Sequence, residues 1–196
     1  MNAHKPLLLW DVDDTLNRQI EIFLEHSPLG AGKEYREIVQ KPQYLAFGVP
    51  KEEYLAELDR CRREFVYDSL PRPEIMEFFR EYGHSFRSMA LSAVPITLAP
   101  LSAAWVLRHF GQWMQGTIYV PSERKGVAIY SQSFGSKAEA AAALNGILID
   151  DTPEHVENCR RAVGRAYTFP APWNGCADMA IEKFLQQLID ELELKK

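Results

Sequence analysis

The sequence predicts an α/β fold, a doubly wound parallel sheet with a small helical insertion after the first strand. The apolar run Leu7–Trp10 is followed at once by Asp11, which indicates a strand buried on both faces with a carboxylate at its end. The same pattern returns at residues 146–151, where a short apolar stretch ends on Asp150 and Asp151. The carboxyl ends of parallel strands lie at one edge of a sheet, and that edge is where such folds bind ligands.

Residues 17–71 interrupt the alternation of strands and helices. A short helix is expected at 20–24, followed by loop and irregular helix at 27–41. Pro50 begins a longer helix with apolar residues at helical spacing, namely Tyr54, Leu55, Leu58, Cys61 and Phe65. We therefore predict an α/β core of residues 1–16 and 72–196 and a helical insertion at 17–71. An inert helical insertion is the alternative to a functional one.

The elements after the insertion follow from apolar runs and from glycine, proline and capping signals. The helix expected at 137–144 begins with a capping box, Ser136 to Glu139. Lys137 then lies in the first turn, where the helix dipole disfavours a cation, so its presence requires another reason. The full expectation is strand 86–92, helix 98–110, strand 117–120, a polar turn at 121–126, a hairpin strand at 127–130, helix 137–144, strand 146–150, helix 153–163, strand 166–169 and a terminal helix beginning at Asp178.

The first acid pair, Asp11 and Asp13, requires a cation, a shared proton or an incoming group, because two close carboxylates repel each other. A calcium-binding EF-hand loop is excluded, since that loop requires Gly where Leu16 stands and Glu where Ile22 stands. A solvated acidic turn remains the alternative to a functional site.

Acid pair, hydroxyl, lysine and acid pair follow one another on strand ends and a helix start, at Asp11/Asp13, Ser92, Lys137 and Asp150. This order resembles the four motifs of the haloacid dehalogenase-like (HAD) hydrolase superfamily. The resemblance covers residues 5–16 and 72–170 and is specific in motif order and context. The insertion stands where members carry a cap module that closes over the site. One departure is Asp14, where many members carry Gly.

The resemblance implies a magnesium-dependent phosphatase that hydrolyses a small phosphomonoester through an aspartyl-phosphate. It implies that Asp11 is the nucleophile, that Asp13 is the general acid and then the base, and that Lys137 offsets the charge of the phosphoryl group. The implied substrate-binding residues are Thr15, Ser92 and Ala93, and the implied Mg²⁺ ligands are Asp11, Asp13 and Asp150. The cap would supply specificity residues, with Arg18, Lys33, Tyr35, Arg36, Lys41 and Tyr44 as candidates, each with a solvated surface residue as the alternative. The Pro-Trp-Asn run at 172–174 and residues 149–153 resemble the deoxyribonucleotidase branch, so a nucleotide is a candidate substrate beside a sugar phosphate.

Two lysines precede Asp150 at spacings that suit the catalytic role. Lys125 lies in a polar turn beside Gly126, and an exposed loop charge is the simpler interpretation of both Lys125 and Arg124. Lys137 lies on a helix start that holds it in place. We therefore expect Lys137 to complete the site.

Composition limits the other possibilities. With 196 residues, 46% of them hydrophobic, the chain can bury a full core, and a net charge of −5 offers no footprint for a nucleic acid polymer. Three cysteines at unrelated spacings and no membrane-spanning apolar run make a reduced, cytoplasmic setting the expectation. The oligomeric state stays open. The alternative functions are a receiver-like signalling module, which would place its lysine after all of its acids, and a HAD-derived binding protein without catalysis.

Overall fold

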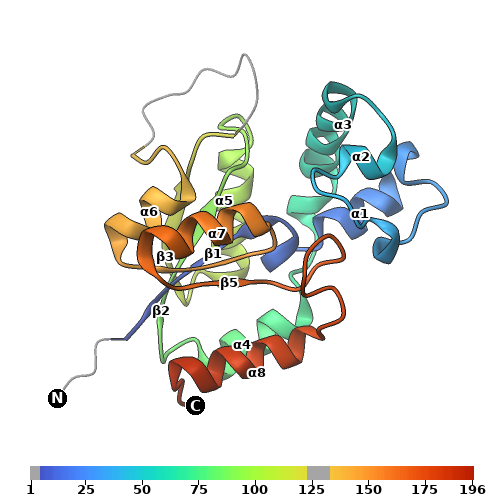
Figure 1. Ribbon diagram of the computed structural model, residues 1–196. Coiled ribbons are helices and arrows are strands. Elements are labelled where there is room, and N and C mark those ends of the chain that lie inside the picture. The colour runs from blue at the N-terminus through green and yellow to red at the C-terminus, as the bar shows by residue number, and fades with distance from the viewer. Residues whose placement is uncertain (1–4, 123–132) are drawn as a thin grey trace.

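The computed structural model describes residues 5–122 and 133–196, and within them five strands form one parallel sheet (Figure 1). The strand order is β3-β2-β1-β4-β5. The bounds are β1 Leu7–Trp10, β2 Arg87–Ser92, β3 Met114–Tyr119, β4 Ile147–Asp150 and β5 Ala166–Thr168. All four residues of β1 are buried, as expected of a central strand covered on both faces. The predicted α/β fold with a parallel sheet is confirmed.

The strand order reverses its direction between β1 and β4. The chain proceeds from β1 outward through β2 to β3, and then returns to place β4 on the other side of β1. Trp10 pairs with Ile149, so that the next residues, Asp11 and Asp150, emerge side by side. Open α/β sheets bind ligands at the carboxyl edge of such a switch point.

Helices cover both faces of the sheet. One face packs against α4 Pro73–Tyr82, α5 Ala99–Phe110 and α8 Ile181–Leu192, in a core that contains Trp10, Phe79, Trp105, Phe110 and Phe184. The other face packs against α6 Lys137–Leu144 and α7 Pro153–Val163 in a smaller cluster built on Leu9, Leu91 and Leu148. The two faces of a strand alternate along the chain, which is why Trp10 and Leu9 belong to different clusters.

The insertion forms a third cluster to one side of the sheet (Figure 1). It contains α1 Gln19–His26, α2 Tyr44–Phe47 and α3 Lys51–Glu64, with single turns at Pro28–Gly30, Tyr35–Glu37 and Val66–Asp68. Phe23, Phe47 and Tyr54 pack in its centre, together with Ala171 and Trp173 from the segment after β5. The insertion therefore shares a core with the carboxyl edge of the sheet.

Most predicted elements lie where they are expected, and several differ. The helices α2 and α4 have no counterpart in the prediction, and β3 begins three residues early, at Met114. The terminal helix begins at Ile181, after Ala180, and not at Asp178. The predicted strand at 127–130, together with Arg124 and Lys125, lies outside the described residues. None of the helices in the described ranges combines the length and apolarity that crossing a bilayer requires.

Candidate active site

The turn after β1 orients the first acid pair. Asp11 continues the sheet, since its backbone N–H donates to the carbonyl of Ile149 at 2.9 Å, and its side chain is nearly buried. The chain then turns irregularly through η1, Val12–Leu16, with Asp14 at φ 61. Aspartate is among the few non-glycine residues that adopt this left-handed conformation readily, and glycine adopts it best. Asp14 therefore adopts a backbone conformation that glycine at this position would also adopt.

Asp14 also holds the turn together. Its carboxylate accepts from the backbone N–H of Ile20 at 2.8 Å, and its own N–H donates to the Asn17 side chain at 3.0 Å. The pKa of Asp14 is raised to about 7, chiefly by burial and also by the nearby Asp151, against the lowering effect of the Ile20 hydrogen bond. Asp14 is thus a structural acid that belongs to the turn.

Lys137 bridges the two strand ends. Its ammonium lies 2.6 Å from Asp11 Oδ1 and 2.7 Å from Asp150 Oδ2, and its side chain is almost completely buried. The Ser136 hydroxyl accepts from the Glu139 N–H at 3.1 Å, which begins α6 and places Lys137 in its first turn. These two carboxylates are the reason for a cation at a helix start, where the dipole alone would disfavour it.

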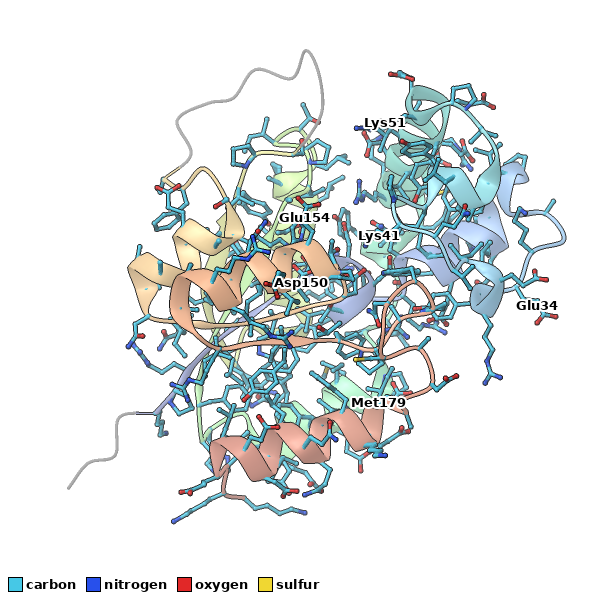
Figure 2. The ribbon with its side chains drawn as sticks, in the orientation of Figure 1. Glu34, Lys41, Lys51, Asp150, Glu154 and Met179 are labelled. Carbon is cyan, nitrogen blue, oxygen red and sulfur yellow. The ribbon has the colours of Figure 1, made fainter. Side chains whose placement is uncertain are left out.

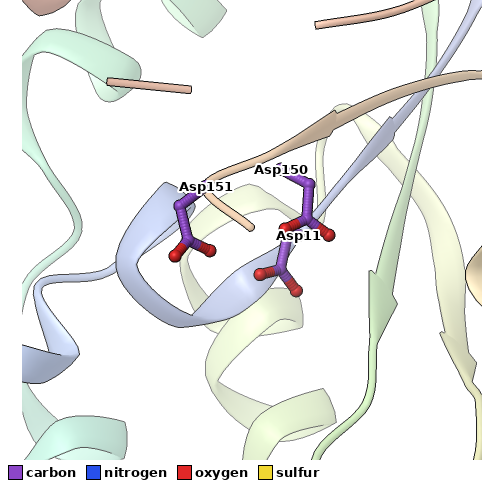
Figure 3. Close-up of side chains that lie close together, drawn as sticks. All are labelled: Asp11, Asp150 and Asp151. Carbon is purple, nitrogen blue, oxygen red and sulfur yellow. The ribbon is translucent and has the colours of Figure 1, made fainter. Parts of the chain in front are cut away.

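The second acid pair supplies the remaining carboxylates. Asp150 accepts from the Thr152 N–H at 2.8 Å and contacts His155 Nδ1 at 3.0 Å. Within the described residues, Asp11, Asp150 and Asp151 bring carboxylate oxygens within 4.8 Å of one another (Figure 3). Carboxylate oxygens are the ligands that Mg²⁺ prefers, so this donor set fits the predicted metal.

Burial and neighbouring charges shift the pKa values of Asp11, Asp150 and Lys137. Burial raises the pKa of Asp11 well above its ordinary value, with Asp150 and Asp151 adding to the effect and Lys137 opposing it. Burial also acts to raise the pKa of Asp150, but Lys137 and His155 more than offset it, so that the net shift is downward. Burial acts to lower the pKa of Lys137, and Asp11 and Asp150 reverse that effect, so that its pKa is raised and the ammonium stays charged.

Asp13 lies on a different hydrogen-bond network. Its Oδ1 accepts from the Asn17 amide at 3.0 Å, and its Oδ2 pairs with Arg62 Nη2 at 2.7 Å. Arg62 lies on α3 of the insertion and is itself fixed by Gln19 at 2.7 Å and by Asp59 at 3.1 Å. Both oxygens of Asp13 are thus held, one by the turn and the other by the insertion.

Asp151 is also held from the insertion. Lys41 Nζ lies 2.5 Å from Asp151 Oδ2, and the Trp173 indole N–H donates to the same oxygen at 2.8 Å. The Lys41 ammonium also lies 4.9 Å from the centre of the Trp173 ring. Asn174 donates to the backbone carbonyl of Asp151 at 2.8 Å, which fixes the second acid pair against the segment after β5.

A cavity of about 1080 Å³ opens between the insertion and the carboxyl edge of the sheet. In Figure 2, Lys41 and Lys51 lie on the insertion, and Asp150 and Glu154 lie on the core that faces it across this cavity. Asp11, Asp13 and Lys137 are part of its wall. The volume is at the upper end of what small-molecule sites occupy, so there is room for a substrate beyond a phosphate group.

Comparison with known proteins shows which known fold this architecture shares. No family model matches the sequence, and no curated protein sequence matches it. Solved structures do match: a haloacid dehalogenase-like hydrolase from Streptococcus pneumoniae is 14% identical with a TM-score of 0.57, and 95% of this chain aligns with 98% of that one. The chain has the fold of the HAD-like hydrolases. The predicted resemblance is therefore confirmed at the level of the fold.

Two further HAD-fold structures have similar scores. A candidate HAD hydrolase from Bacillus subtilis, solved with magnesium bound, is 14% identical with a TM-score of 0.55 over 96% of this chain and 99% of its own. A candidate phosphoglycolate phosphatase from Lactobacillus plantarum is 16% identical with a TM-score of 0.53 over 96% and 99%. At such identities the likeness shows the fold.

The HAD fold brings most of the predicted site residues to one cavity. Ser92 and Ala93 line it beside Asp11, Asp13 and Lys137, and the Ser92 hydroxyl accepts from the Val94 N–H at 3.2 Å. Asp150 is fully buried and reaches the site through Lys137. Thr15 is also fully buried, is not part of the cavity wall, and its hydroxyl has no hydrogen-bond partner among the described residues.

The insertion contributes both expected and unexpected residues. Of the six specificity candidates, Lys41 and Tyr44 line the cavity, whereas Arg18, Lys33, Tyr35 and Arg36 do not. Arg62 of the insertion, and His155 and Trp173 of the core, also line it and are not among the predicted site residues. Arg62 had a usable signal, because it follows the buried Leu58 by four residues and so lies on the same face of its helix.

Proposed function

We propose that this protein is a magnesium-dependent phosphatase that hydrolyses a small phosphomonoester through an aspartyl-phosphate at Asp11. The observation that carries the proposal is the position of Lys137, buried between Asp11 and Asp150 in the wall of the cavity. A surface lysine has no reason to be buried between two acids at a helix start. A phosphoryl-transfer site requires such a charge.

The acids explain how the metal would be held. We propose that Asp11, Asp150 and Asp151 are its carboxylate ligands, since these three lie together. The side chain of Asp13, a ligand in the prediction from sequence, is directed to Arg62, so its part in metal binding stays a prediction. Bound Mg²⁺ would neutralise charge on the phosphate and on the carboxylates around it.

The residues of the chain account for the remaining chemistry. An Asp11 oxygen attacks phosphorus, the bond from phosphorus to the substrate alcohol breaks, and the departing oxygen takes a proton from Asp13, which must enter this step as the neutral acid and so without its ion pair to Arg62. Water then attacks the phosphorus of the aspartyl-phosphate while Asp13 accepts its proton, which releases phosphate and regenerates the Asp11 carboxylate. Lys137 offsets the negative charge throughout, and Ser92 and Ala93, which line the cavity, would contact the phosphoryl group.

Two other functions make different predictions. A receiver-like module would be phosphorylated at Asp11 by a donor and would not turn over a phosphate ester. A HAD-derived binding protein would bind phosphate esters and release no phosphate. The order of Lys137 before Asp150 and the presence of the insertion favour the phosphatase over the receiver.

The test is turnover of p-nitrophenyl phosphate by the purified chain, with Mg²⁺ and with EDTA. We expect release of p-nitrophenol only with the metal, and no release by Asp11→Asn at unchanged circular dichroism. Beryllofluoride, a mimic of the aspartyl-phosphate, should bind the wild type with Mg²⁺ and should fail to bind Asp11→Asn. Wild-type turnover that survives in EDTA, or in Asp11→Asn, would contradict the mechanism.

A further inference from the structure

The cavity wall contributed by the insertion is largely apolar at its solvent-facing positions. Val39 is 60% exposed and Leu45 is 52% exposed, and both line the cavity. The described residues include five exposed large hydrophobic side chains, so two of the five lie at this one place. Exposed apolar side chains gathered in a concave site indicate contact with a ligand.

The core contributes further apolar groups to the same cavity. Val94 and Pro95 follow β2, and Val120 and Pro121 follow β3, and all four line the wall. Leu55 of α3 lies in the wall as well, on the side of the insertion. An alcohol bound here would therefore meet apolar surface from both the insertion and the sheet.

The charges of the cavity leave little attraction for a second anionic group. Among the described residues, four cationic side chains line it, Lys41, Lys51, Arg62 and Lys137, and five carboxylates line it, Asp11, Asp13, Asp14, Asp151 and Glu154. With His155 counted as neutral and before any Mg²⁺ binds, the formal sum over these described residues is four minus five, or −1.

Lys41, Arg62 and Lys137 each face a carboxylate. The ammonium or guanidinium nitrogens of Lys41, Arg62 and Lys137 lie 2.5, 2.7 and 2.6 Å from carboxylate oxygens. Gln40 and Gln43 supply uncharged polar groups in the same stretch of the wall, which suits a hydroxyl and offers no charge to an anion. A carboxylate or second phosphate on the substrate would thus meet a described wall that has more carboxylates than cations.

We propose that the substrate is a monophosphate ester of an uncharged, largely apolar alcohol, and that Val39 and Leu45 bind this alcohol. The proposal rests on the proposed phosphatase function and narrows its substrate. It sets this chain apart from an enzyme for phosphoglycolate, whose leaving group carries a carboxylate.

The first experiment compares alkyl phosphates of increasing length under Mg²⁺. Ethyl, butyl and hexyl phosphate have nearly the same intrinsic reactivity, so a change in kcat/KM among them reports binding of the alkyl group. We expect kcat/KM to rise about two- to fourfold for each added methylene, as transfer of apolar surface from water predicts. Replacing the terminal methyl group of butyl phosphate with a carboxylate should lower kcat/KM by about tenfold or more.

The second experiment assigns this preference to the wall. Leu45→Ser and Val39→Ser should each lower kcat/KM for hexyl phosphate by about fivefold, because part of the apolar contact with the alkyl group is lost, and should lower it much less for ethyl phosphate. Leu70→Ser is the matched control, since Leu70 is 72% exposed and is not part of the wall.

The outcomes separate the two proposals. Suppose that phosphate release requires Asp11 but does not depend on the length of the alkyl group, or is faster for the carboxylate ester. This result would overturn the proposal of an apolar substrate and would leave the proposed phosphatase function intact. An equal loss in Leu45→Ser and in Leu70→Ser would also overturn it. No release from any ester would overturn the phosphatase, and the substrate proposal with it.

Discussion

Replacing Lys137 with methionine should destabilise the fold as well as stop catalysis. Methionine retains most of the apolar stem but leaves Asp11 and Asp150 buried without the ammonium that lies 2.6 and 2.7 Å from them. Removing one partner of a buried ion pair costs about 3–5 kcal/mol. Because two carboxylates share this ammonium, we expect a loss of about 4–5 kcal/mol in the free energy of unfolding when no metal is present.

The assay is urea unfolding of wild type and variant, each with EDTA and with Mg²⁺. With an m-value of about 2 kcal/mol per molar urea, a loss of 4 kcal/mol lowers the midpoint by about 2 M. If Asp11, Asp150 and Asp151 hold the metal, Mg²⁺ at about one hundred times its dissociation constant should restore about 2.7 kcal/mol. The kcat of the variant should fall by about 10²- to 10³-fold, and Mg²⁺ should not restore it, because the metal replaces only part of the charge.

The exposed Lys183 on α8 provides a control, and Lys183→Met should change neither stability nor kcat measurably. A loss of less than 1 kcal/mol for Lys137→Met in EDTA, with kcat within threefold of wild type, would refute the role given to Lys137. The catalytic role would then pass to Lys125, which lies outside the described residues.

Three further predictions concern the acids and the backbone. Asp11→Asn should reduce phosphatase turnover below detection, because an amide cannot form the acyl-phosphate, and a stopped assay for phosphate release checks this. Asp150→Asn should weaken Mg²⁺ binding more than Asp151→Asn, as measured by titration calorimetry, and the reverse order would exchange the two assignments. Gly30→Ala should cost about 1–3 kcal/mol in urea unfolding, since its Cβ would lie 2.5 Å from the backbone of α1, while Gly175→Ala, with nothing within 4 Å, should be neutral.

The parts of the site that the sequence predicted depend on local signals. The run Leu7–Trp10 is apolar without interruption because both of its faces are covered, and this alone indicates a central strand with Asp11 at its end. The Ser136 hydroxyl contacts the N–H three residues later, so the start of α6 and the position of Lys137 follow from adjacent residues. The helix α4 carried a comparable signal in Pro73 at its first position, and the prediction did not use it.

The contacts that the sequence could not predict join distant segments. Arg62 and Asp13 are 49 residues apart, and Lys41 and Asp151 are 110 residues apart. A charged residue on a helix is most often solvated, and no local pattern distinguishes the one that packing will bury against an acid. The sequence indicates on which face of its helix Arg62 lies. Its partner Asp13 could not be predicted, because the contact depends on how α3 packs against the turn after β1.

These long-range pairs bear on whether the insertion is inert. An inert insertion would pack only on its own residues and would make no contact with the acids of the core. Here its central cluster includes Trp173, and two of its cations, Arg62 and Lys41, contact Asp13 and Asp151. Moving the insertion away would leave both carboxylates without their counter-charges, at a cost that buried pairs make large. The same segment that supplies the apolar wall for the substrate therefore also holds two acids of the site, so substrate binding and the position of those acids are coupled through one packed unit.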